Sequence, residues 1–453
     1  MMQTSSEAKN GAKNIISRCL GLSSGHDVLI FADETTLDVS MVLAEAAGML
    51  DVVPIVVLIP KSIQRYIPDK QSLPISVQGI AKDVRVIITC TNADSECMPF
   101  REYILETQLS AHTRIGHMPG ANLDLLGLAN VDFDRLVEDC NRIECMMAQG
   151  HELELKSTDS FGRTHLLKAD IGGWERLPVA SNGVIEDGVW GNVPSGETYI
   201  APLKGTSEGS VVINGSVPGL VVEPRNEIVL YFEQGKLTKI SPETSSVARH
   251  LNRTQFDTAR KNHDPNWTSL AEIGVGVNPA VSRLTGNMLY DEKALGTAHI
   301  AVGSNTFMGG GIDSLIHCDM VIKKPTIVID DLMILDNGAL IDSGGIESFK
   351  DVSLSHSPLR FAQAVAQSGT QTKVSRDKKL KRKLRPEPGR ISLCTIGDDK
   401  TSEIAVSLFE QLPPSGQFVD ISILARKVQL DDEVTRKVLH IMLKYDIIKL
   451  DRG

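Results

Sequence analysis

Hydrophobic residues in the first third of the chain form short continuous runs, separated by stretches in which apolar residues recur at helical spacing. Continuous runs are typical of strands buried on both faces, and the stretches between them are typical of helices. The pattern predicts strands at 27–33, 53–59 and 84–90, a helix at 37–50, and a helix at 133–147 that closes the domain. We therefore expect an α/β domain of parallel βα units over residues 1–150.

The pattern changes after residue 150. Short apolar segments are interrupted by Gly, Pro, Asn and Asp, and helical spacing is nearly absent before 257–263. The clearest predicted strands are 152–156, 209–214 and 228–232. Residues 151–369 are therefore predicted to form a β-rich, mostly antiparallel domain with long loops, and all the candidate metal ligands described below fall inside it.

A basic run, Lys373–Arg385, is followed by Pro386 and predicts a solvated linker over residues 370–390. Beyond it, the spacing of apolar residues predicts a small module over residues 391–453, with helices at 402–412, 421–428 and 432–444 and a closing strand at 447–450. This order resembles a winged helix. The helices carry as many acidic as basic residues, so we favour a docking module for a protein partner over nucleic acid binding.

The composition and two missing motifs restrict the classes of protein to which the chain can belong. A chain of 453 residues exceeds what one core usually serves, and 42% hydrophobic with 23% charged residues is typical of globular proteins. The net charge of −10 argues against nucleic acid binding by the chain as a whole. Seven scattered cysteines indicate a reducing cytoplasm rather than a disulfide framework. No apolar run approaches the roughly 18 residues that span a bilayer. After the first strand, Ala-Asp-Glu-Thr-Thr replaces the glycine-rich turn of a dinucleotide site.

Histidines and carboxylates recur in four segments of the β-rich region: 192–197, 271–279, 291–301 and 317–319. Oxygen and nitrogen ligands of this kind hold one or two transition-metal ions. In an extended strand His317 and Asp319 point to the same face while Cys318 points away. Each signal alone has an ordinary alternative, a surface pair for His317 and Asp319 and a structural histidine for His299. The candidate ligands are Glu197, Glu272, His299, His317 and Asp319.

Together these segments resemble, in order, the motifs of the metallo-aminopeptidases of the aminopeptidase T and aminopeptidase S type. Those motifs are N-L-P-x-G-E-V-F-x-A-P, A-E-x-G-x-G-x-N-P, L-x-D-E-K-x-x-G-T-x-H-I-A and H-x-D, and they match 192–202, 271–279, 289–301 and 317–319. With the upstream segment 113–120, the resemblance extends over about residues 15–350. It implies two zinc, cobalt or manganese ions on the five candidate ligands, and hydrolysis of a peptide or amide bond by metal-activated water. Glu272 or Glu197 is then expected to bridge the ions or accept the proton of the water.

The chain departs from the aminopeptidase pattern at two points, and these departures are compatible with a second activity. The family has a tyrosine seven residues after the first histidine, where this chain has Thr306, and the loop 303–316 is shorter than in a typical aminopeptidase. The related 2,5-dihydroxypyridine dioxygenases use two histidines and one aspartate on a single Fe(II), and His299, His317 and Asp319 can supply that triad. Such a site does not require Glu197 or Glu272. A pseudoenzyme is a third class, but it is expected to have broken ligands, and these are intact.

His117 is the remaining catalytic candidate. It flanks an Arg-Ile-Gly turn that is predicted at the end of a βα unit, where ligands of parallel sheets bind, and it is a candidate acid, base or substrate contact. The alternative is an ordinary loop histidine. For partners, the resemblance implies a small peptide or amide substrate, and we expect a homodimer. The composition favours the cytoplasm and argues against a membrane or nucleic acid partner.

Overall fold

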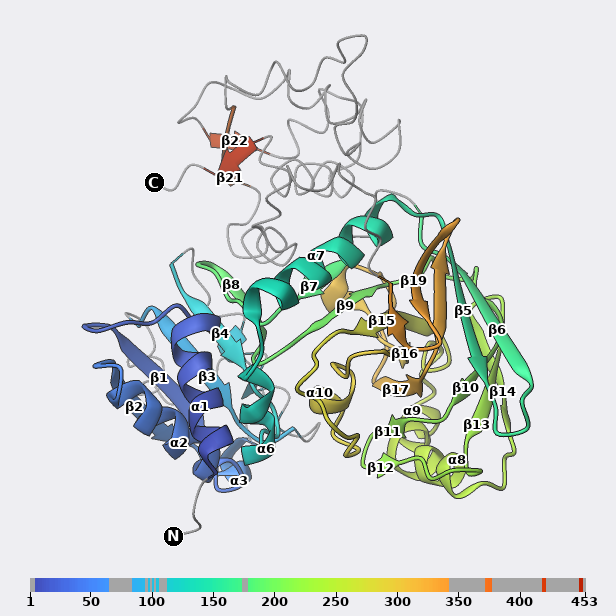
Figure 1. Cartoon of the computed structure of the whole chain (residues 1–453), viewed down its shortest axis with the longest axis horizontal. Helices are drawn as coiled ribbons and strands as arrows, with labels where there is room; N and C mark the ends of the chain where they lie inside the picture. Colours follow the sequence, from blue (N-terminus) through green and yellow to red (C-terminus); the bar gives the residue numbers. More distant parts are fainter. Residues whose placement is uncertain are drawn as a thin grey trace.

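The computed structural model describes residues 5–64, 84–93, 112–172 and 178–341, with Cys97, residues 100–101 and 103–105, and three short strands beyond residue 370. Within these residues the chain is a mixed α/β protein with several sheets (Figure 1). No helix among them is long and apolar enough to cross a membrane.

The first sheet has five parallel strands in the order β2-β1-β3-β4-β8. Their bounds are β1 Asp27–Ala32, β2 Val53–Leu58, β3 Val86–Cys90, β4 Arg114–His117 and β8 Val189–Asn192. The parallel strands predicted from the first three apolar runs are all present. Strand β8 lies within the residues assigned to the β-rich domain, but it pairs with β4 in the first sheet. The domain boundary predicted at residue 150 is thus crossed by a later strand.

The sheet is buried on both faces, which explains the continuous apolar runs. Val28 and Ile30 of β1 belong to one core, whereas Leu29 and Phe31 belong to another on the opposite face. The first core is covered by helices from the N-terminal half of the chain. They are α1 Ser6–Asn14 with a π-helical continuation Ile15–Cys19, α2 Leu37–Gly48, and α6 Leu123–Leu126 with a 3-10 continuation Gly127–Ala129. The short helix α3, Lys61–Gln64, follows β2.

The β-rich part contains an eight-stranded sheet in the order β14-β13-β10-β6-β5-β18-β19-β20 and a β11-β12 ribbon, and its strand pairs are antiparallel. The bounds are β5 Glu152–Thr158, β6 Thr164–Asp170, β10 Glu208–Ile213, β11 Ser216–Val217, β12 Leu220–Val221, β13 Ile228–Glu233, β14 Lys236–Ser241, β18 Thr326–Ile329, β19 Leu332–Asp336 and β20 Ala339–Leu340. The helices between them are α8 Ser246–Leu251, the π-helical turn Asn252–Phe256, and α9 Asp257–Lys261.

A third sheet carries the candidate metal ligands and has the antiparallel order β17-β16-β15-β9-β7. Its strands are β7 Val179–Ser181, β9 Glu197–Ile200, β15 Leu270–Gly276, β16 Thr297–Gly303 and β17 His317–Lys323. The helix α10, Met288–Asp291, and the 3-10 helix Thr306–Met308 lie in the loops that precede and follow β16.

Helix α7, Phe133–Gln149, begins with Asp132 as its N-cap, whose carboxylate accepts hydrogen bonds from the amides of Asp134 and Arg135. The sequence predicts that this helix closes the first domain. Phe133 does lie in the first core, but Cys140 and Met147 lie in the core of the β-rich part. Figure 1 shows α7 running along β7 and β9. The helix therefore contributes residues to both cores and packs against one face of the third sheet.

Near the C-terminus the described residues form one small sheet, β22-β21-β23. Its strands are β21 Gln371–Arg376, β22 Phe418–Asp420 and β23 Ile448–Leu450. The start of the predicted basic linker, Lys373–Arg376, is thus paired in a strand, because its backbone has partners in β22 and β23. The closing strand agrees with the prediction. The three predicted helices at 402–412, 421–428 and 432–444 lie outside the described residues, so the winged helix stays a prediction.

Candidate metal centre

The register of the third sheet places all five candidate ligands on one face. Residues directly opposite each other in antiparallel strands point to the same side. Gly276 is opposite Glu197, Gly274 is opposite His299, and Ala301 is opposite both Glu272 and Asp319, while Gly303 is opposite His317. The ligands therefore alternate with glycine and alanine across four strands, which leaves open space above the sheet for the longer side chains.

The opposite face of the same sheet is apolar. Ile273, Ile300 and Met320 alternate with the ligands and are buried in the core that α7 covers. On this side the hydroxyl of Thr198 donates a hydrogen bond of 2.9 Å to the carbonyl of Cys140 in α7. Burial of this face fixes the register of the sheet, since a slip of one residue would exchange the ligands with the core.

Gly274 sets the position of His299. A Cβ atom at residue 274 would lie 2.1 Å from Nε2 of His299 and 2.2 Å from its Cε1. The imidazole thus lies directly over the backbone of β15, in space that only glycine leaves. His299 itself is fully buried.

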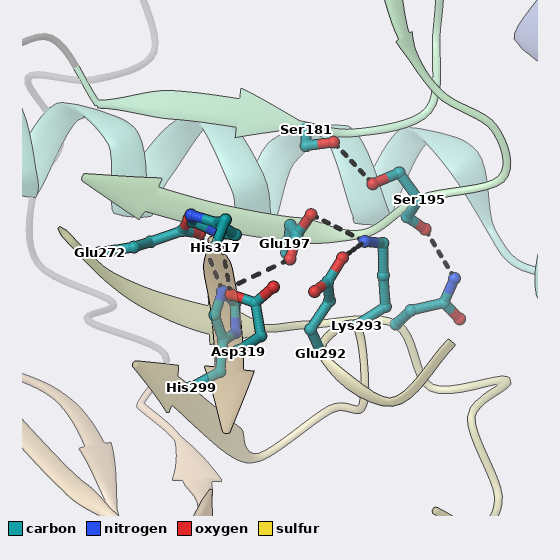
Figure 2. A network of polar contacts seen from close by, with 10 residues as sticks. Ser181, Ser195, Glu197, Glu272, Glu292, Lys293, His299, His317 and Asp319 are labelled. Atoms are coloured by element: carbon teal, nitrogen blue, oxygen red, sulfur yellow. Dashed lines mark hydrogen bonds and ion pairs between the residues drawn. The ribbon is translucent and has the colours of Figure 1, made fainter. Parts of the chain in front are cut away.

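Glu272 lies between the two histidines (Figure 2). Its Oε1 is 3.1 Å from Nε2 of His299, and its Oε2 is 3.2 Å from Nε2 of His317. Nε2 of His317 is also 3.2 Å from Oδ1 of Asp319, and Nε2 of His299 is 3.7 Å from Oε2 of Glu197. Each oxygen of Glu272 thus faces one histidine. Each of these histidines in turn faces one further carboxylate, that of Glu197 for His299 and that of Asp319 for His317.

Among the described residues, one group offers three metal-ligand atoms that all lie within 4.8 Å of one another: Glu272, His317 and Asp319. The Nδ1 of His317 donates to the carbonyl of Ser304 at 2.7 Å, which orients the ring and directs Nε2 toward the carboxylates. On the other side, Oε2 of Glu197 is buried and has no hydrogen-bond partner. An orphaned carboxylate oxygen beside an imidazole nitrogen fits a divalent metal ion, and so does the mixed set of ligands.

The charges of these side chains also fit a cation. Burial opposes the charged forms of Glu272 and His299, but their mutual hydrogen bond and the neighbouring charges outweigh it. The pKa of Glu272 is lowered to about 2 and the pKa of His299 is raised to about 9. Burial raises the pKa of Glu292 to about 8. Without a metal, protons on the histidines balance the carboxylates, and a metal ion would displace those protons.

Lys293 and Glu292 belong to the same network, although the sequence analysis did not single them out. The amino group of Lys293 is 2.9 Å from Oε1 of Glu197 and forms an ion pair with Glu292 (Figure 2). The available sequence signal was the position of both residues inside the motif at 289–301. Tyr199 also lies on the ligand side, since it is opposite Gly274. Burial and the charges of Glu272 and Glu197 raise the pKa of its phenol well above the usual value.

His117 lies at the end of β4 in the first sheet, so it is not part of the cluster. Its Nδ1 is 2.8 Å from the hydroxyl of Thr89, and its ring meets that of Trp190 edge to face at 5.8 Å between centroids. Burial and the nearby Arg101 lower its pKa to about 3, so the imidazole is neutral at pH 7. A role as a cationic acid therefore has no support, and a role as a substrate contact stays a prediction. Thr306, at the position of the family's tyrosine, is exposed.

Fold and site together define the class of protein: a mixed α/β chain with a candidate metal centre on one face of an antiparallel sheet. A family model described as NicX: 2,5-dihydroxypyridine 5,6-dioxygenase matches residues 135–342, which span this sheet and less than half of the chain. No curated protein sequence matches the chain.

Two solved enzyme structures share the fold. One is a 2,5-dihydroxypyridine dioxygenase from Pseudomonas putida KT2440, with a TM-score of 0.56, 18% identity, and coverage of 74% of this chain and 97% of that chain. The other is wild-type AmpT from Thermus thermophilus, with a TM-score of 0.53, 16% identity, and coverage of 74% and 99%. The resemblance to both branches, inferred from the motifs, is thus confirmed. At these identities the likeness shows the fold alone.

Proposed function

We propose that the chain is a metal-dependent hydrolase that cleaves a peptide or amide bond. The observation that carries this proposal is the position of Glu272, whose two carboxylate oxygens face two different histidines at 3.1 and 3.2 Å. This arrangement suits a carboxylate shared between two metal positions. One position would have Glu197 and His299 as its further ligands, and the other would have His317 and Asp319. Zinc, cobalt or manganese matches these ligands.

Bound metal would supply a water molecule acidified toward neutral pH and a Lewis acid for the scissile carbonyl. The chain's own residues perform the other tasks. The apolar core behind the sheet and the hydrogen bond from His317 to the carbonyl of Ser304 hold the ligands in place. Glu197 would bind the metal ion on the side of His299, because its Oε2 is buried and has no hydrogen bond.

A mononuclear Fe(II) dioxygenase is the second candidate, and the match to the dioxygenase family model favours it. His299, His317 and Asp319 would then form the triad of ligands. The geometry supports this candidate less well. Among the described residues, the compact group contains Glu272 together with His317 and Asp319, whereas His299 does not belong to it.

Replacement of Glu272 by glutamine separates the two candidates. In a two-metal hydrolase the variant should lose at least one of two bound ions, and its rate should fall by about 100-fold or more, because the shared ligand is weakened at both positions. A dioxygenase should keep its single iron. Metal content by elemental analysis, and turnover of an amino acid anilide and of 2,5-dihydroxypyridine, measure both outcomes.

Glu233→Gln is the matched control, since Glu233 is exposed at the end of β13 in another sheet. It should retain the metal content and the rate of the wild-type protein. One iron per chain in Glu272→Gln, with oxygen consumption preserved, would reject the hydrolase and establish the second candidate.

A further inference from the structure

Lys293 is a fully buried cation next to the candidate metal ligands. Its amino group donates a hydrogen bond of 2.9 Å to Oε1 of Glu197 and also forms an ion pair with Glu292. A lysine in such surroundings is retained only where its charge is compensated. Figure 2 shows the amino group of the lysine in contact with both carboxylates, on the side of Glu197 that is away from His317.

The backbone is built to bring Lys293 to this position. Gly276 is opposite Glu197 in the sheet, and a Cβ atom at residue 276 would lie 2.3 Å from the carbonyl oxygen of Ala294 and 2.7 Å from that of Glu292. The segment that carries Lys293 therefore lies directly on β15 beside Glu197. The amide of Asn278 donates to the carbonyl of Lys293 at 2.8 Å and holds this segment in place.

The lysine makes the two oxygens of Glu197 unequal. Oε1 accepts the hydrogen bond from Lys293, whereas Oε2 is buried without a hydrogen-bond partner and lies 3.7 Å from Nε2 of His299. A carboxylate fixed in this way offers one defined oxygen toward the imidazole and cannot turn its other oxygen there without breaking the ion pair.

We propose that Lys293 is a positioning residue that holds Glu197 so that Oε2 forms a metal position together with His299. The inference rests on the proposed function, because it requires a metal ion at that position. It differs from a purely structural role, in which Lys293 would only balance buried carboxylates and would contribute to folding without affecting one metal position more than the other.

The test uses full-length protein freed of metal and titrated with Zn²⁺ in calorimetry, with Lys293→Met as the variant. Methionine keeps an unbranched side chain, one heavy atom shorter than that of lysine, and removes the charge. We expect the affinity of one binding step to fall by about 10–100-fold, as for other residues that orient metal ligands, while the second step is unchanged. Lys293→Arg, which retains the charge, should recover part of the loss.

Two comparisons separate positioning from general stability. In a Glu197→Gln background, Lys293→Met should have no further effect on affinity, because it acts through Glu197. Lys236→Met removes another lysine, one that bonds to the carbonyl of Pro265 and the hydroxyl of Ser269. It should lower the melting temperature without changing Zn²⁺ affinity.

Each outcome has a consequence. If Lys293→Met does not fold, the double variant Lys293→Met/Glu292→Gln, which also replaces the acid paired with the lysine, takes its place. Unchanged affinity in a folded variant, or equal effects with and without Glu197, overturns the role of Lys293 while leaving the metal centre intact. Wild-type protein that binds no Zn²⁺ instead overturns the proposed function, so the two failures are distinguishable.

Discussion

Alanine at either His317 or Asp319 will remove at least one metal ion and abolish activity while the fold is retained. The two residues occupy alternate positions of β17, on the face away from the core, and Nε2 of the histidine is 3.2 Å from Oδ1 of the aspartate. The residues opposite them in β16 are Gly303 and Ala301, which have no side-chain ligand to replace a missing one. Metal affinity should fall by more than the factor of about 10–100 that is typical when a group supporting a metal ligand is removed. Elemental analysis and circular dichroism measure metal content and fold.

Asp336→Ala is a suitable control, because Asp336 is an exposed carboxylate at the end of β19 in the eight-stranded sheet. It should behave as the wild-type protein does. Full metal occupancy in both His317→Ala and Asp319→Ala would contradict the assignment of the centre, whatever the reaction proves to be.

Much of the first sheet could be predicted because its signals are local. The apolar runs at 27–33 and 53–59 correspond to β1 and β2, and the helix expected at 133–147 is α7 with two more residues. Strand β8 could not be placed in the same way. Its partner β4 lies far away in the sequence, and no local pattern records which sheet a short strand joins.

The candidate ligands were found for a different reason. Their motifs resemble a known family, and this identified the residue types but not how they are arranged. The sheet register and the position of Glu272 between His299 and His317 depend on long-range pairing of β15, β16 and β17. Lys293 was within a quoted motif, yet a lysine in a polar segment ordinarily indicates a solvated face. Its complete burial is visible only in the fold.

Gly274→Ala tests that arrangement without changing any candidate ligand. The new methyl group would lie 2.1 Å from Nε2 of His299, but it would meet the tip of a side chain rather than backbone. The imidazole can therefore turn away, and the cost in stability should stay within the about 1–3 kcal/mol typical of an overpacked core. A ring that has turned away no longer faces Glu272 or Glu197. We expect a folded protein with reduced metal content and activity lowered by about 100-fold or more, as measured by thermal melting, elemental analysis and turnover.

Gly48→Ala provides the matched control, because a Cβ atom at residue 48 meets nothing within 4 Å and the position lies at the end of helix α2. Alanine there should leave metal content unchanged and stabilise the helix slightly, by up to about 1 kcal/mol. Since both variants add one methyl group to a glycine, a difference in metal content between them reports on the imidazole of His299 alone. Wild-type metal content in Gly274→Ala would mean that metal binding does not require the imidazole of His299 in its position over β15. Glu272, His317 and Asp319 would then remain as the ligands, and a centre with a single ion would be favoured.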